Sequence, residues 1–403
     1  MYRCMLGFLL FFCSWATPVT AWFDGDYEIQ NDYLDTENFF DIKAYQPPLS
    51  WQREWAKTDS GMFATVGSIS MERFYLVQQL RLNVPIQKTL GIAYEYLEES
   101  IYRQSQPFQE ASFWVGAPWN FSIIGFPAHN KRLGHMGYAG GYGDRSQDFR
   151  FRLSRLSQYA LYNEKNVVDY GHQIEDQYIN TPVAYRLEWG WVVPRQFLVS
   201  LDVSNDQESR LQVFQPALQK SHQGQSGELL AEIGDPKQSL FGLQLKQKLR
   251  RRRQISPDQP EADQRQQVDF HWVDVYHQIN GNQDWRATLG VQQSSFTNNR
   301  DQGKRSDDFA HHLKSKQVYG KWQLHPDSPM SYLFSLQAGT IDWFVKQGEE
   351  PEEQEGSIQI KATCGLLVYT QDQYRVYLNS TWDLDTFRQR QWDGGNLMMQ
   401  FQF

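Results

Sequence analysis

The sequence predicts an all-β chain that folds into a single antiparallel transmembrane β-barrel of about 16–18 strands. Three observations predict this fold class. Side-chain polarity alternates with a period of two residues in many short segments, and short turns alternate with longer polar connections along the chain. Beyond residue 21, no apolar run approaches the roughly 20 residues that a membrane-spanning helix needs.

The composition excludes several other classes of protein. Aromatic residues make up 15% of the 403 residues, yet the mean hydropathy is −0.64. The low hydropathy argues against a helical membrane protein, and the many aromatic residues argue against a disordered chain. The net charge of −8 gives no support to nucleic-acid binding, so we expect no nucleic-acid partner.

Residues 1–21 have the pattern of a secretory signal peptide. Arg3 supplies the positive charge, residues 6–12 (LGFLLFF) form the apolar region, and Val19-Thr20-Ala21 is a small-residue cleavage site. The alternative is an N-terminal anchor helix, but the apolar run is too short to span a bilayer. After cleavage Cys364 is the remaining cysteine, so we expect no intrachain disulfide.

Two-residue alternation identifies the strands. In residues 183–193 (VAYRLEWGWVV), Tyr185, Leu187, Trp189 and Trp191 fall on one face, while the charged residues between them fall on the other. Only a strand turns this spacing into a surface with two distinct faces. The same alternation occurs at 74–84, 90–96, 149–153, 241–246, 268–272, 285–291, 357–368, 374–381 and 396–403.

The connections between these segments are sorted by length. Short ones rich in turn residues lie at 85–88, 116–119, 143–148, 193–196, 234–237, 280–284, 325–329 and 370–373. Longer polar ones lie at 98–108, 127–132, 164–178, 204–225, 250–266, 297–312, 346–356 and 383–395. This alternation is typical of a hairpin barrel with short periplasmic turns and long external loops.

The chain divides into three parts: the signal peptide at 1–21, an acidic irregular segment at 22–60, and a barrel at 61–403. The segment at 22–60 is a periplasmic extension, a plug in the lumen or a first strand, and its sequence does not distinguish these. Strands counted from residue 72 onward number 17, and residues 62–70 add one more at the start.

The chain resembles Gram-negative outer-membrane β-barrel proteins of the porin type. The resemblance rests on the signal peptide, the order of strands and connections, and the aromatic residues Phe401 and Phe403 at the C-terminus. In that class the barrel-assembly machinery recognises a terminal aromatic residue, although Met398 stands where a glycine is often found. The resemblance implies an integral protein of the cell outer membrane, in contact with membrane lipid and lipopolysaccharide. The alternative is a soluble secreted β protein.

If apolar positions face lipid, the residues between them face the lumen. The predicted basic lumen residues are Arg73, Arg81, Arg150, Arg152, Arg186, Lys246, Lys248, Arg286, Lys321, Lys361 and Arg375. The predicted acidic ones are Glu95, Glu188, Asp202, Glu232 and Asp269. Girdle residues at the membrane interfaces are predicted to be Tyr185, Trp189, Trp191, Trp322 and Tyr374.

An excess of basic residues in a wide lumen attracts anions. We therefore expect a pore for passive transport of polar anionic solutes or acidic saccharides. The simpler interpretation is that these charges pair across strands and keep the channel wet. A further alternative is a non-conducting sheath or scaffold for a partner protein or an exported polymer.

Other candidate sites receive less support from the sequence. The basic run from Lys246 to Arg253 predicts an external cluster for lipopolysaccharide phosphates or an acidic glycan, or a solvated loop base. Asp269 and His271 share one face, but no serine is placed with them and no ligand spacing suggests a metal. We expect neither catalysis nor a cofactor.

Overall fold

The computed structural model describes most of residues 60–402. It leaves out 70–72, 88–89, 102–103, 116–118, 126–135, 143–148, 158–176, 181–182, 194, 215–216, 236, 256–262, 282–283, 303–308, 327, 348–352, 371–373 and 385–391. The predicted signal peptide and residues 22–59 lie outside the described residues. Within the described ranges no helix has the length and apolar content needed to cross a bilayer.

Nineteen strands make up the described chain and join one sheet. The first nine are β1 (Gly61–Ile69), β2 (Arg73–Gln87), β3 (Leu90–Ile101), β4 (Gln104–Val115), β5 (Trp119–Gly125), β6 (Met136–Tyr142), β7 (Phe149–Ser157), β8 (Gln177–Asn180) and β9 (Val183–Val193). The others are β10 (Phe197–Phe214), β11 (Ala217–Asp235), β12 (Ser239–Ile255), β13 (Gln264–Gly281), β14 (Trp285–Gln302), β15 (Phe309–Leu324), β16 (Met330–Gln347), β17 (Glu353–Thr370), β18 (Tyr374–Asp383) and β19 (Trp392–Gln402).

The strand pairings form a closed ring. Successive strands pair antiparallel, and β1 pairs with both β2 and the last strand, β19. The short strand β8 pairs with the far end of β10, whose near end pairs with β9. β8 and β9 therefore share one position, and the nineteen strands fill eighteen positions, within the predicted range.

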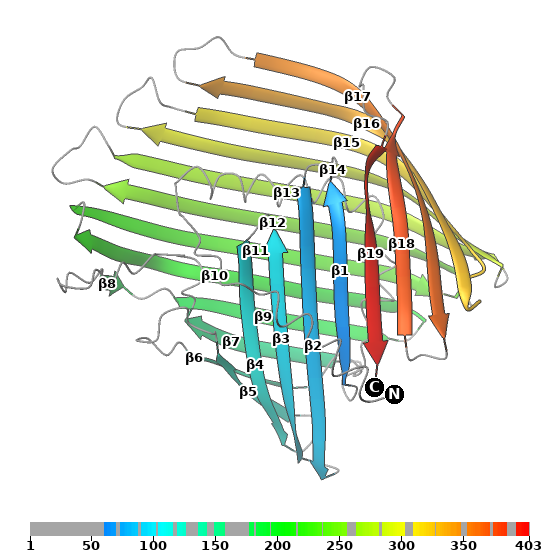
Figure 1. Cartoon of the computed structure of the whole chain (residues 1–403), viewed down its shortest axis with the longest axis horizontal. Helices are drawn as coiled ribbons and strands as arrows, with labels where there is room; N and C mark the ends of the chain where they lie inside the picture. The colour runs from blue at the N-terminus through cyan, green and yellow to red at the C-terminus, as the bar shows by residue number, and fades with distance from the viewer. Residues whose placement is uncertain are drawn as a thin grey trace.

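The walls of this ring cross one another in projection. Strands β10–β17 form one wall, and β18, β19 and β1–β4 form a wall whose strands run across them (Figure 1). Strands that tilt relative to the axis of a barrel produce this crossing. The all-β chain with its ring of antiparallel pairings confirms the barrel fold predicted from the sequence, while its location in a membrane stays a prediction.

Tight turns hold one rim of the ring together. In the turns at 193–197 and 235–239, Gln196 N donates to Val193 O at 3.0 Å and Gln238 N donates to Asp235 O at 2.9 Å. Gly234, with a φ of 124°, adopts a backbone conformation that other residues rarely take. Neighbouring turns also bond to one another, since Gly234 N donates to Gln196 O at 2.8 Å. These turns fix the register of the strands that they join.

Side chains sort between the two faces of the sheet as predicted. Among the strand residues whose side chains the structure describes, every exposed large hydrophobic one falls on one face, with Phe241, Leu289 and Val318 between 55% and 61% exposed. The opposite face carries the buried polar side chains, including Gln244, Gln292 and Lys361. We call these the outer and inner faces, because side chains that point into a closed ring converge and cover one another.

The outer face has the dimensions of a bilayer-facing surface. On β17 the outer residues from Ile358 to Val368 are apolar or small, with Ile358 67% exposed. They span roughly 33 Å along the strand, which becomes roughly 23 Å along an axis tilted by about 45°. Apolar bands of transmembrane barrels are about 25 Å tall.

Several segments predicted as loops are strands in the structure. Most of 204–225 lies in β10 and β11, whose pairing continues to Phe214 and Ala217. Residues 250–255 likewise belong to β12 and 297–302 to β14. The backbone hydrogen bonds between two strands do not depend on apolar side chains. Two paired strands can therefore extend beyond the apolar region even where the residues on both faces are polar.

Tyrosines lie flat over glycines on the inner face. A Cβ on Gly242 of β12 would lie 2.0 Å from Cζ of Tyr276, and one on Gly290 of β14 would lie 2.4 Å from Cζ of Tyr319. By crossing the glycine, Tyr276 donates a hydrogen bond of 2.6 Å to Glu232, two strands away on β11. Tyr319 likewise donates to Asp274 of β13 at 2.9 Å, so each tyrosine links three strands and fills the space that the glycine leaves.

We predict that Gly242→Ala lowers the free energy of unfolding by about 1–3 kcal/mol, because the added methyl group displaces the Tyr276 ring and its bond to Glu232. Urea unfolding followed by tryptophan fluorescence measures the effect. The control is Gly227→Ala on β11, where a Cβ meets nothing closer than 4.0 Å. Equal stability of the two variants would contradict a supporting role for the glycine–tyrosine pair.

Candidate functional site

Charged residues form a continuous row along the inner face of five neighbouring strands. The register pairs Arg152 of β7 with Glu188 of β9, Glu188 with Asp202 of β10, Asp202 with Glu228 of β11, and Glu228 with Lys246 of β12. Directly paired residues point to the same face and stand side by side. We call this row the charged belt.

A second row lies one step along the strands. It runs from Arg186 of β9 through Ser204 of β10 and Ser226 of β11 to Lys248 of β12 and Phe270 of β13. Each residue of the second row on β9–β12 is two positions from a belt residue of the same strand. Because residues two apart share a face, both rows lie on the inner face.

Ion pairs connect the belt residues to one another and to Arg186 of the second row. Arg186 binds both carboxylate oxygens of Asp202, with its Nε 2.8 Å from Oδ1. Its guanidinium also lies 3.5 Å from Glu188, which in turn lies 3.7 Å from Arg152. Each carboxylate of this part of the belt therefore has a guanidinium beside it.

The other end of the belt is held by a lysine. Lys246 Nζ lies 2.8 Å from Glu228 Oε1, which also accepts a hydrogen bond from Gln244. The same ammonium group lies 5.6 Å from the centre of the Trp272 ring, within range of a cation–π attraction. Lys246 is thereby fixed between a carboxylate and an aromatic face.

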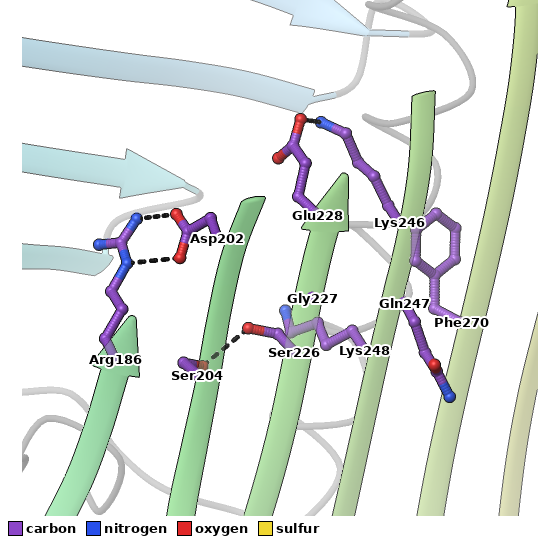
Figure 2. Close-up of a pocket in the computed structure, with 10 residues that line it drawn as sticks. All are labelled: Arg186, Asp202, Ser204, Ser226, Gly227, Glu228, Lys246, Gln247, Lys248 and Phe270. Atoms are coloured by element: carbon purple, nitrogen blue, oxygen red, sulfur yellow. Dashed lines mark hydrogen bonds and ion pairs between the residues drawn. The ribbon is translucent and has the colours of Figure 1, made fainter. Parts of the chain in front are cut away.

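Between the two ion pairs the wall is hollowed. Figure 2 shows the pair Arg186–Asp202 on one side of this recess and the pair Glu228–Lys246 on the other. The hydroxyls of Ser204 and Ser226 meet between them at 2.8 Å. The recess has a volume of about 340 Å³, and its lining is Arg186, Asp202, Ser204, Ser226, Gly227, Glu228, Lys246, Gln247, Lys248 and Phe270.

The register places all the predicted basic lumen residues on the inner face. Arg152, Arg186, Lys246 and Lys248 come together in the two rows. Arg286, Lys321 and Lys361 stand apart from them, on β14, β15 and β17. Arg73, Arg81, Arg150 and Arg375 are placed by backbone register alone. Whether any of them selects solutes stays a prediction.

The balance of charge on the inner face differs from the prediction. Asp269 was expected in the lumen, but it lies on the outer face, because its neighbours Val268 and Phe270 occupy the inner one. Its Oδ1 lies 3.0 Å from Nε2 of His271 on that outer face. Glu228 and Asp274 are inner residues that the sequence analysis missed, although the two-residue period from Lys246 and from Tyr276 could have found them.

The basic run from Lys246 to Arg253 is not a single cluster. All of it belongs to β12, so alternate residues face opposite sides of the sheet. Lys246 and Lys248 line the inner recess, whereas Arg251 and Arg253 are exposed on the outer side. The prediction that the run enters a loop at residue 250 is wrong, because strand β12 continues to Ile255.

The predicted aromatic positions lie on the outer face. Tyr185, Trp191 and Trp322 are 40–45% exposed there, and Trp191 packs edge-on against Phe197 with 4.9 Å between ring centres. Trp189 and Tyr374 share this face by register. Phe401 also lies on the outer face, while Phe403 falls outside the described residues.

Among the described residues, no three His, Cys, Asp or Glu side chains are grouped to hold a metal.

The solved structures that are similar to this chain include bacterial outer-membrane proteins. OpdK of Pseudomonas aeruginosa with vanillate is 11% identical, covers 86% of this chain and 98% of its own, and has a TM-score of 0.41. OccAB2 of Acinetobacter baumannii is 9% identical, with coverages of 86% and 98% and a TM-score of 0.41. The outer-membrane channel DcaP of the same organism is 9% identical, with coverages of 86% and 96% and a TM-score of 0.38.

No protein-family model matches the chain, and no curated protein matches it either. At these identities and TM-scores the comparison leaves the function to be inferred from the chain's own side chains.

We predict that the Arg186–Asp202 pair contributes little to stability. The side chains are 43% and 36% exposed, and ion pairs in such positions contribute about 0–1 kcal/mol. A double-mutant cycle of Arg186→Gln and Asp202→Asn, followed by urea unfolding, measures the coupling. A coupling of several kcal/mol would contradict this and mark the pair as a structural element of the wall.

Proposed function

We propose that the chain is an integral barrel of the Gram-negative outer membrane that forms a pore of the porin type for polar solutes, with a preference for anions. The observation that carries the proposal is the sorting of side chains on a closed ring. In a bilayer every backbone polar group must be paired, and the outer face must be apolar. The eighteen-position ring meets the first condition, and its outer face meets the second.

The anion preference follows from the two inner rows, and it is modest. Arg152, Arg186, Lys246 and Lys248 exceed the carboxylates of Glu188, Asp202 and Glu228 by one charge. Paired charges largely cancel at a distance, so these two rows contribute about one positive charge to the potential of a hydrated lumen. One net charge gives a selectivity of up to roughly fivefold.

Single-channel recording in planar bilayers tests the pore and its selectivity. Under a salt gradient we expect a reversal potential that indicates anion preference. The variant Arg186→Gln/Lys248→Gln should move it toward the cation side, because it removes two inner cations. Lys237→Gln, in the exposed turn after β11, removes one positive charge away from the two inner rows and should have no effect. Cation preference in the unmodified protein would refute the electrostatic part.

A second candidate is a barrel that encloses a partner or an exported polymer and does not conduct by itself. The observation behind it concerns conduction: inner side chains on β14–β17, including Ser294, Gln317, Ser331 and Lys361, are buried by the chain's own atoms. A lumen filled with water leaves its lining exposed. Bilayers that show no conductance while a tight partner copurifies with the protein would favour this candidate.

Outer-face cations favour the lipid partners expected from the sequence. Lys314 and Lys316 are exposed on the outer face of β15, and the apolar band begins at the next outer residue, Val318. Ammonium groups at this border suit the phosphates of lipopolysaccharide. We also propose that the barrel-assembly machinery recognises the C-terminal strand.

Fractionation tests the membrane location. We expect the protein in the outer-membrane fraction, released by detergent and with a gel mobility that changes on heating, because paired strands in a closed ring resist unfolding by detergent alone. Recovery in the soluble fraction without detergent would contradict the location.

A further inference from the structure

We propose that the recess between the pairs Arg186–Asp202 and Glu228–Lys246 is a binding subsite for an acidic sugar unit. This inference rests on the proposed pore, since it gives the class of solute that the inner wall recognises. It differs from general attraction of anions, because the recess contains acceptors as well as cations.

The mixture of donors and acceptors favours a ligand rich in hydroxyl groups. Asp202 and Glu228 stand side by side in the register and would repel a simple anion. The hydroxyls of Ser204 and Ser226 lie between the ion pairs and can both donate and accept. A sugar hydroxyl can donate a hydrogen bond to these carboxylates and accept one from the cations. A simple carboxylate or halide ion can accept hydrogen bonds but has none to donate.

The charge balance favours one acidic group on that ligand. The cations that line the recess are Arg186, Lys246 and Lys248, against the carboxylates of Asp202 and Glu228. The lining therefore carries one more positive than negative charge, which suits a ligand with a single carboxylate or phosphate. Guanidinium and ammonium groups bind such groups by charge-assisted hydrogen bonds.

The size and the floor of the recess fit one or two sugar rings. Its volume of about 340 Å³ lies at the lower end of the range for small-molecule sites. Phe270, which pairs with Lys248 and with Phe296, provides an apolar surface beside the charges. A pyranose ring has an apolar C–H face that packs on such a surface.

The spacing of the two ion pairs also favours an extended ligand over a small ion. Arg186 and Lys246 stand on strands three positions apart, which separates their backbones by roughly 14 Å. One small anion cannot contact both ends of the recess, whereas an acidic sugar with hydroxyls around its ring reaches from one pair toward the other.

Binding is measured with three probes of six carbon atoms each: D-glucuronate, D-glucose and hexanoate. The first has both hydroxyls and a negative charge, the second has hydroxyls alone, and the third has the charge alone. Detergent-solubilised full-length protein is titrated with each, with tryptophan fluorescence as the readout because Trp272 contacts Lys246. We expect glucuronate to bind at least about tenfold more tightly than either other probe, since it alone uses both kinds of contact.

A matched pair of variants tests the position of the site. Ser204→Ala/Ser226→Ala removes the two hydroxyls of the recess and should weaken glucuronate binding about tenfold. The control is Thr363→Ala/Thr381→Ala, which removes another hydroxyl pair of the inner wall, 2.9 Å apart on β17 and β18. The control should bind glucuronate as the unmodified protein does.

The outcomes separate the inference from the proposed pore. Conductance without preferential glucuronate binding, or equal loss in both double variants, overturns the sugar subsite and leaves the pore. Glucuronate binding that depends on Ser204 and Ser226 in a protein that does not conduct overturns the pore and leaves the subsite. Current block by glucuronate at lower concentration than by hexanoate supports both.

Discussion

The structure depends on one constraint, which is the pairing of backbone hydrogen-bonding groups in a sheet without free edges. Once β1 pairs with both β2 and β19, each ring position has two neighbours. In an apolar solvent an unpaired edge costs several kcal/mol per group, so closure is the condition for a spanning sheet. Closure then gives the chain an inside and an outside, and the two-residue period of each strand assigns every side chain to one of them.

The inner face uses two different kinds of interaction. Near the short turns, Tyr276 and Tyr319 cross glycines to reach carboxylates, and the second of these, Asp274, is buried and accepts from Tyr319 at 2.9 Å. Along β7–β12 the wall carries the charged belt, whose side chains are partly exposed. Buried links give the wall rigidity, whereas exposed ion pairs can exchange partners with a solute at little cost in stability.

The sequence alone could predict which side chains point inward and which point outward. This is because their alternation with a period of two residues is visible within each strand by itself. It placed Trp191 outside and Lys246 inside without any knowledge of strand partners. One error, Asp269, arose from choosing the wrong parity in a segment with apolar residues on both faces, where Val268 and Phe270 are inner and Val273 is outer. The ends of the strands were also underestimated, because a polar hairpin such as β10–β11 has no apolar signal.

The recess could not be predicted, because it depends on register between strands. Ser204 and Ser226 are 22 residues apart, and no single segment shows that their hydroxyls meet. The pairing of Arg186 with Asp202 likewise requires the turn at 193–197 to set which residues stand opposite. What appeared in sequence as an excess of basic residues is therefore an ordered belt in which most cations have a carboxylate beside them.

Site-directed spin labelling in lipid vesicles tests the sorting of side chains most directly. In a Cys364→Ala background, labels at Leu289 and Val318 report on the outer face, and a label at Ser226 reports on the recess. The account predicts that lipid-dissolved oxygen relaxes the first two labels, while a water-soluble nickel chelate relaxes the third. Relaxation of the labels at Leu289 and Val318 by the nickel chelate, with the label at Ser226 in contact with lipid, would contradict it.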